Sequence, residues 1–340
     1  MGVKIKTCNH GIYAGMIGQY IAYKRSLGFK MEDVEERLRR FDTLTMERQE
    51  HKIGISKELF DAWSCPLPEE SESNRYHRIS LLRGFSAYLQ LAGYDSCVPQ
   101  MPKCNSTFIA HIYTKQEIDS IFRECDRLFP RHLHTHSQMC VMPALIRTLY
   151  ATGIRIGEAL NLKHKDVELD TGYLVLHECK NGRERVVPFS LSLREVLRDY
   201  GVYKQLQTTE TKADDYFFTS PDGRPCTASA VYEIFRTVLL RAGISHGGRG
   251  KGPRLHDLRH TFCVNALVRM SEAGQDLYYS MPVIMTYMGH QSIEATNRYV
   301  RLTAEMYPDL LRKANEAYQY VFPEIGIAIG DTDNDNSTAP

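Results

Sequence analysis

Apolar side chains recur at helical spacing over most of the 340-residue chain. In the first hundred residues, three stretches carry this pattern: 12–29, 34–48 and 74–94. The last of them places Ile79, Leu82, Phe85 and Leu89 on one stripe and arginines elsewhere, which is typical of an amphipathic helix with one buried face. The spacing therefore predicts a small, all-helical bundle in this part of the chain.

The helical pattern stops after residue 94. Residues 95–107 hold two prolines and several turn-forming residues, which favours a linker. The length of the chain also favours two domains. We expect a helical domain over 1–104, a linker over 105–112, a second domain over 113–325 and a disordered acidic tail over 326–340.

The second domain begins with a helix and then changes period. Thr114 and Glu117 fit a capping box at the start of that helix. Helical spacing continues over 142–162, whereas residues 172–189 alternate like paired strands, with an Asn-Gly pair at the tight reversal. Further helices are predicted at 228–242, 257–272, 282–288, 293–299 and 304–320. The expected fold class is mainly α, with a small antiparallel β-hairpin or sheet in the second domain.

The composition is that of an ordinary globular protein, with 43% hydrophobic residues, 24% charged residues and a net charge of +1. No stretch is apolar for long enough to span a membrane, and the N-terminus lacks the apolar region of a signal peptide, so we expect a cytoplasmic protein. Nine scattered cysteines without a CxxC pair indicate reduced, mostly buried thiols.

Charge is distributed unevenly along the chain. Residues 241–260 hold five arginines or lysines and one acid, Asp257, whereas the last fifteen residues hold three aspartates and no base. The balanced total therefore does not exclude a polyanionic partner.

Six residues, far apart in the sequence, form a chemically coherent series: Arg155, Lys180, His256, Arg259, His290 and Tyr299. Two guanidiniums can grip the nonbridging oxygens of a phosphate and offset the charge of a pentacovalent transition state. A phenol can attack the phosphorus and hold the phosphoryl group covalently. A lysine can protonate the departing alkoxide, and histidines can donate hydrogen bonds or move protons. The arginines supply the positive charge that a metal ion otherwise would.

Each of these residues has a plainer interpretation when taken alone. Arg155 and Glu158, three positions apart on a predicted helix, are able to interact as a surface ion pair. A lysine at a hairpin tip is usually solvated, and a tyrosine on a helix usually lies at the edge of a core. The site is indicated by the ordered set.

The set resembles the motifs of the tyrosine recombinase (phage integrase-like) family over residues 12–320. The matching segments are "TGIRIGE", "CKNGRERVVP", "HDLRH", "MGH" and "NRYV", and they fill all six catalytic positions of the family, with Glu158 supporting Arg155. Residues 74–94 are similar to the second half of the family's core-binding (SAM-like) domain. The end of the chain resembles transposases and integrases of mobile elements.

The resemblance implies a site-specific recombinase that clamps double-stranded DNA between two domains. Tyr299 would form a 3′-phosphotyrosyl intermediate, and strands would be exchanged through a Holliday junction in a homo-tetramer, with no metal, ATP or other cofactor. The free protein would be a monomer or weak oligomer, associated with the nucleoid and acting with or without accessory proteins. The helix after Tyr299 would dock on a neighbouring protomer or on its own core.

Basic residues of both domains are candidates for DNA contacts, either to phosphates or to base edges. They are Arg75, Arg78, Arg83, Arg249, Lys251 and Arg254.

Several other interpretations stay open from the sequence. A type IB-like topoisomerase uses related chemistry without synapsis, and a catalytically silent DNA-binding regulator would usually lose one of the six positions. The histidines of "RHLHTH" over 131–136 raise the idea of zinc, although no obvious partners accompany them. His260 is interpreted as a packing or supporting residue, and Trp63 as a core residue rather than a base-stacking one.

Overall fold

The computed structural model describes residues 11–102, 110–128, 136–177, 184–206, 212–247, 252–289 and Tyr299. The chain divides into two compact units, Met1–Phe108 and Ile109–Pro340. This division falls inside the segment predicted as a linker, 105–112. Among the described residues, no helix is both long and apolar enough to cross a membrane.

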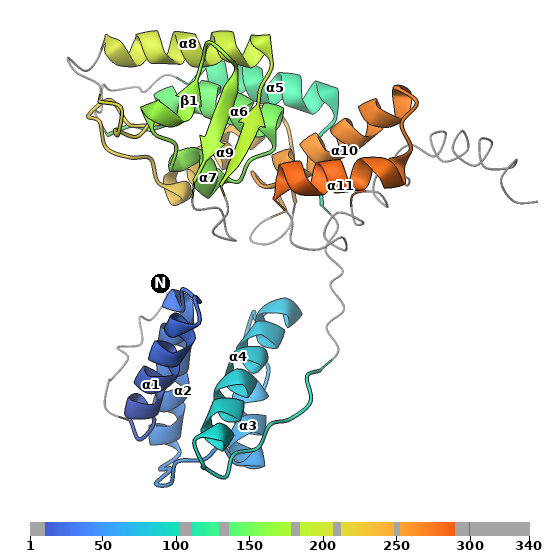
Figure 1. The fold of residues 1–340 in the computed structure, drawn as a ribbon. Coiled ribbons are helices and arrows are strands. Elements are labelled where there is room, and N and C mark those ends of the chain that lie inside the picture. Colours follow the sequence, from blue (N-terminus) through green and yellow to red (C-terminus); the bar gives the residue numbers. More distant parts are fainter. Residues whose placement is uncertain are drawn as a thin grey trace, which may run out of the picture. The chain divides into compact units, whose positions relative to one another are not determined.

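The first unit consists of helices with a core of their own (Figure 1). They are α1 (Ala14–Ser26), α2 (Glu32–Glu47), α3 (Lys57–Ser64) and α4 (Glu72–Leu91). Ile79, Leu82, Phe85 and Leu89 are each at most 2% exposed, which confirms the predicted apolar stripe of α4. Helix α3 was not predicted, and its Trp63 is buried in the core as expected.

The second unit combines helices with a small sheet (Figure 1). Its helices are α5 (Lys115–Asp126), α6 (Met142–Thr152), α7 (Ile156–Leu160), α8 (Leu191–Gln205), α9 (Ala228–Arg241), α10 (Asp257–Glu272) and α11 (Leu277–Met288). Two single 3₁₀ turns lie at Met139–Val141 and His164–Asp166. The predicted capping box of α5 is present, since Thr114 and Glu117 exchange hydrogen bonds.

The sheet has three antiparallel strands in the order β1 (Val167–Glu168), β2 (Tyr173–Leu176) and β3 (Arg185–Pro188). Strands β2 and β3 pair, as the alternating pattern predicted, and their register places Val175 opposite Val186. Leu174 and Val187 face the core, whereas Val186 is 59% exposed. Residues 178–183, including Lys180, lie outside the described residues.

Two predictions about elements were wrong, and one further helix was missed. The helix expected over 142–162 is two helices, because the chain turns at Gly153. Helix α8 was not predicted. Helix α11 begins at Leu277 and continues through Pro282, where we expected it to start; a proline there removes one backbone hydrogen bond but did not end the helix.

Two apolar clusters fill the second unit. The larger one gathers buried residues of α5, α6, α8, α9 and the sheet. The smaller one lies between α10 and α11 and contains Tyr299. Helix α10 packs against both α6 and α11, so it connects the two clusters. Residues of α10 therefore lie where the two clusters meet.

Candidate active site

A left-handed glycine turns the chain into the site. Gly153 ends α6 with φ of 62°, a conformation that side chains disfavour. A Cβ at this position would lie 2.4 Å from the ring of Phe262 on α10, so the close packing also requires glycine. The reversal leaves Arg155 in an extended conformation just before α7.

Arg155 and Glu158 do contact each other, but for a different reason than helical spacing. Arg155 is the N-cap of α7, and Glu158 is the third residue of that helix. One carboxylate oxygen of Glu158 accepts from the backbone N–H of Arg155, and the other from its guanidinium, both at 2.8 Å. These two hydrogen bonds to one carboxylate fix the guanidinium at the start of the helix.

Arg185, on β3, is a residue that the sequence analysis missed. Its guanidinium donates two hydrogen bonds to Glu158, of 2.7 and 3.1 Å. Burial alone would raise the pKa of Glu158, but the hydrogen bonds from Arg185 and Arg155 hold that pKa at about 2. The sequence did indicate that Arg185 lies on a strand, because it precedes Val186 and Val187 in the alternating pattern. That pattern gave no indication of a partner for Arg185 on α7.

Arg259 is buried in α10 and joins two separate helix ends. It is 3% exposed, and its guanidinium donates 2.6 Å hydrogen bonds to the carbonyls of Gly153 and Met288. These carbonyls lie at the end of α6 and at the end of α11. Burial, followed by the charge of Arg155, lowers the pKa of Arg259 to about 10, so it remains protonated at neutral pH.

His256 precedes α10 beside the arginines. Burial lowers its pKa to about 4, and the positive charges of Arg259 and Arg254 act in the same direction. The imidazole is therefore neutral at pH 7 and carries one N–H donor and one acceptor nitrogen.

Tyr299 lies in the smaller apolar cluster and is 4% exposed. Its hydroxyl is 2.9 Å from Nδ1 of His260 on α10. The phenol is also near enough to Arg259 to influence the pKa of that guanidinium. The candidate nucleophile and the arginines thus belong to one site within a single chain.

The electrostatic balance of this site favours an anion. Arg155 and Arg185 both lower the pKa of Arg259, whereas Glu158 opposes them. Three guanidiniums around one carboxylate leave an excess of positive charge. A phosphate diester is an anion that arginines bind in this way.

Of the predicted site residues, the structure brings together Arg155, Glu158, His256, Arg259 and Tyr299. Lys180 and His290 lie outside the described residues. Gly289, directly before His290, has φ of 62°, and a Cβ there would lie 3.1 Å from the guanidinium of Arg185.

The residues predicted to contact DNA differ in their surroundings. Arg83 is exposed on α4, and Arg75 donates a 2.8 Å hydrogen bond to the carbonyl of Ser64. Arg78 is buried, with its guanidinium bonded to both oxygens of Glu70 and to backbone carbonyls.

The prediction that Arg78 is a DNA contact therefore needs correction, because this side chain stabilises the interior of its own unit. In the second unit, Arg254 donates hydrogen bonds to Asp257. Arg249 and Lys251 lie outside the described residues.

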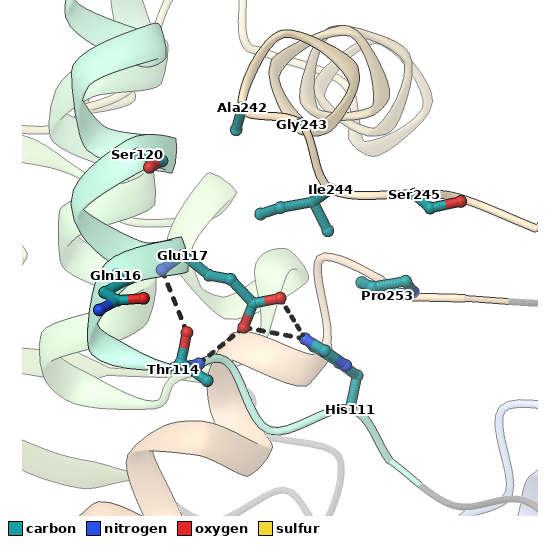
Figure 2. A pocket seen from close by; sticks show the side chains of 10 residues that line it. All are labelled: His111, Thr114, Gln116, Glu117, Ser120, Ala242, Gly243, Ile244, Ser245 and Pro253. Carbon is teal, nitrogen blue, oxygen red and sulfur yellow. Dashed lines mark hydrogen bonds and ion pairs between the residues drawn. The ribbon is translucent and has the colours of Figure 1, made fainter.

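A shallow pocket of about 440 Å³ lies elsewhere in the second unit, between the start of α5 and the end of α9 (Figure 2). His111 and Thr114 both bond to the carboxylate of Glu117 in its wall. These polar groups satisfy one another. No group of three or more potential metal ligands occurs in the part of the chain that the structure describes.

A family model supports the assignment that the site suggests. Residues 112–306 match the phage integrase family. Among curated proteins, "Putative integrase/recombinase y4rB" of Sinorhizobium fredii is 29% identical over 306 residues, which are 89% of this chain and 97% of that protein. The tyrosine recombinase XerC of Oceanobacillus iheyensis is 26% identical over 81% of this chain and 85% of its own.

Solved structures share the fold. A lambda integrase dimer bound to a COC′ core site has a TM-score of 0.60 and 15% identity, covering 84% of this chain and 94% of that one. The Tn1549 transposon integrase in complex with circular intermediate DNA has a TM-score of 0.56 and 18% identity, with the same two coverages. The chain belongs to the phage integrase family and is a tyrosine recombinase.

Proposed function

We propose that this protein is a site-specific DNA recombinase in which Tyr299 attacks a phosphodiester and forms a 3′-phosphotyrosyl intermediate. One observation carries the proposal: the Tyr299 hydroxyl is 2.9 Å from Nδ1 of His260, the residue directly after Arg259 on α10, so the phenol lies beside the arginine cluster. The phenol provides the attacking oxygen, and the guanidiniums provide the charge that the pentacovalent transition state requires.

Arg155 and Arg259 bind the nonbridging oxygens of the scissile phosphate. Arg259 is suited to this because two carbonyls hold its guanidinium in place before DNA arrives, so little reorganisation is needed. Neutral His256 donates a hydrogen bond to the same phosphate. By the family resemblance, Lys180 protonates the departing 5′ oxygen and His290 adds a further hydrogen bond.

The substrate that we propose is double-stranded DNA, clamped between the two units and exchanged in a homo-tetramer through a Holliday junction. Support comes from the likeness to a lambda integrase tetramer bound to a Holliday junction, with a TM-score of 0.56. The likeness to a transposon integrase favours a mobile-element integrase. Such a protein acts at the bacterial nucleoid, with or without accessory proteins.

Nicked duplexes from the DNA that flanks the protein's own gene test this function. Cleavage of such a substrate releases a short fragment, so the covalent protein–DNA adduct accumulates and its position can be mapped. We expect the adduct on Tyr299 and unchanged yield in the presence of a chelator. Tyr299→Phe should abolish the adduct but keep DNA binding within about twofold, since it removes the attacking oxygen alone.

The competing functions give different results in the same assays. Relaxation of supercoiled DNA by a monomer, without strand exchange between two sites, would identify a topoisomerase. Binding without an adduct on any flanking duplex would identify a regulator. Strand cutting by the Phe variant would reject Tyr299 as the nucleophile.

A further inference from the structure

Three side chains of the second unit form a line that ends at the attacking oxygen. Asp257 and His260 lie one turn apart on α10, with Oδ1 of Asp257 3.9 Å from Nε2 of His260. The other ring nitrogen, Nδ1, is 2.9 Å from the hydroxyl of Tyr299. Asp257 is 1% exposed, His260 7% and Tyr299 4%, so bulk water has little access to this line.

We propose that His260 is the general base of DNA cleavage and accepts the proton of the Tyr299 hydroxyl as the phenol attacks. This proposal deepens the recombinase function above and rests on it. It replaces the interpretation of His260 as a packing residue. The geometry fits the requirement for a general base, which must lie within hydrogen-bond distance of the proton that it removes.

The carboxylate of Asp257 favours the tautomer that this role needs. His260 can accept from the phenol at Nδ1 when its proton resides on Nε2. A negative charge 3.9 Å from Nε2 stabilises the proton there and also the imidazolium that forms during the reaction. Asp257 is itself held in place by the backbone N–H and the guanidinium of Arg254.

The charged groups near this line mainly stabilise the phenolate that Tyr299 becomes when it loses its proton. Arg259, next in sequence to His260, is close enough to interact with Tyr299 and stabilises negative charge on its oxygen. The ring of His256 meets that of His260 edge to face, with centroids 5.0 Å apart. Burial raises the pKa of Asp257, and the contacts with Arg254 and the charge of His111, in the segment before α5, oppose this rise. A neutral base between these groups accepts a proton without separating charge over a long distance.

The Tyr299 oxygen forms a bond to phosphorus, the bond from phosphorus to the 5′ oxygen breaks, and the phenolic proton passes to Nδ1 of His260. A separate group protonates the leaving 5′ oxygen. In rejoining, the 5′ hydroxyl returns its proton to that separate group as its oxygen attacks the phosphotyrosine, the bond from phosphorus to the Tyr299 oxygen breaks, and His260 returns its proton to the phenolate.

The test combines an isosteric variant with a modified substrate. His260→Asn places an amide near the position of Nδ1, which can keep a hydrogen bond to Tyr299 but cannot accept its proton. We expect DNA binding within about twofold of the unaltered protein and single-turnover cleavage slower by about 10²–10⁴-fold. A duplex with sulfur in place of the bridging 5′ oxygen has a leaving group that needs no proton, so it should not restore this variant.

Cys263→Ala is the matched packing control, because Cys263 is buried in the same apolar cluster and lies one turn further along α10. It should cleave at nearly the normal rate. Cleavage by His260→Asn within threefold of the control would overturn the proposal, as would recovery on the sulfur substrate, which would assign His260 to the leaving group. An adduct formed by Tyr299→Phe would instead overturn the proposed function itself.

A measurement on the unaltered full-length protein covers the case in which the Asn variant does not fold. In ¹⁵N NMR spectra of the imidazole nitrogens, His260 should give the signals of a neutral ring protonated on Nε2. Its Nδ1 resonance should shift in Tyr299→Phe, which identifies the signal as that of His260. A ring protonated on Nδ1 at this position would contradict the assignment of His260 as proton acceptor.

Discussion

At the residue scale, Glu158 holds the arginines of the candidate site in place and offsets part of their positive charge. Its carboxylate binds the guanidiniums of Arg155 and Arg185 and caps α7 at the same time. Without it, neighbouring arginines would repel one another in a partly buried place. With it, their positions are fixed while the cluster as a whole stays cationic, as an anion site requires.

Replacing this carboxylate should therefore cost stability. We expect Glu158→Gln to lower the free energy of unfolding of the second unit by about 2–4 kcal/mol, because it leaves the 12%-exposed Arg185 side chain without its counter-charge. Urea titration followed by circular dichroism measures the loss. The control is Glu36→Gln, which breaks an exposed ion pair with Arg40 and should change stability by less than about 0.5 kcal/mol.

His256 makes stability depend on pH in a direction that follows from its lowered pKa. The unfolded chain binds a proton near pH 6.5, whereas the folded protein resists it until about pH 4. Stability is therefore complete above pH 6.5 and is lost as the pH falls toward 4. His164 adds to the effect, because burial and the charge of Lys204 lower its pKa to about 4 as well.

We expect the Tm of the second unit to fall by about 3–6 °C between pH 7 and pH 5, after allowing for partial solvent screening. Calorimetry over this range measures it. His256→Asn should have a shallower pH dependence, because the variant lacks one of the two titrating rings. A Tm that does not change in this range would contradict the buried, neutral state of His256.

At the scale of elements, the turn between α6 and α7 positions the site. Gly153 provides the left-handed turn, its carbonyl binds Arg259, and Arg155 follows two residues later. One short segment thus connects both predicted catalytic arginines. The geometry of the cluster depends on this turn more than on the length of either helix.

Gly153→Ala should disrupt that geometry. A Cβ there would occupy the space of the Phe262 ring. The left-handed φ would also destabilise the folded state of the alanine variant by about 1–2 kcal/mol. We expect unfolding at lower urea and little cleavage, with the DNA affinity less affected. Gly157→Ala is the matched control: nothing lies within 4 Å of its added Cβ, so alanine in α7 should be neutral or stabilise by up to about 1 kcal/mol.

The same segment explains what the sequence could and could not predict. Apolar periodicity identified the core stripe of α4 and the pairing of β2 with β3, because a buried face requires it. It also continued across Gly153, since Ile154 and Leu160 are buried on either side of α7's start. The break comes at Gly153, whose left-handed conformation ends α6. The ring of Phe262, which is distant in sequence, occupies the space that a Cβ at Gly153 would need, and apolar periodicity does not report such a contact.

The candidate site divides in the same way. Ordered motifs identified Arg155, His256, Arg259 and Tyr299, because their chemistry is visible residue by residue. Arg185 and the contact of His260 with Tyr299 depend on pairs brought together from different elements. Arg78 was misjudged for the same reason: its partner Glu70 lies on the loop before α4 and neutralises a charge that looked exposed.

At the scale of the whole molecule, two units with separate cores predict separate contributions to stability. Trp63 is the single tryptophan of the chain and lies in the first unit. Its fluorescence therefore follows unfolding of that unit, whereas circular dichroism follows both. The substitutions above at Gly153, Gly157, Glu158 and His256, which lie in the second unit, should leave the Trp63 transition nearly unchanged.

The proposed binding of DNA by both units also predicts how DNA affinity responds to salt. Each phosphate that a basic side chain neutralises adds about 0.9 to the slope of log affinity against log salt concentration. Arg83 is exposed on α4, so its contact with a phosphate should appear as a slope lower by about 0.9 in Arg83→Gln. Arg127→Gln makes the same charge change on α5, at a side chain that is 65% exposed and paired with Glu124, and should leave the slope unchanged. Titrations of a duplex at several salt concentrations measure both. Equal slopes for the two variants and the unaltered protein would remove Arg83 from the DNA interface, whereas a loss of affinity restricted to certain sequences would indicate that Arg83 reads a base edge instead.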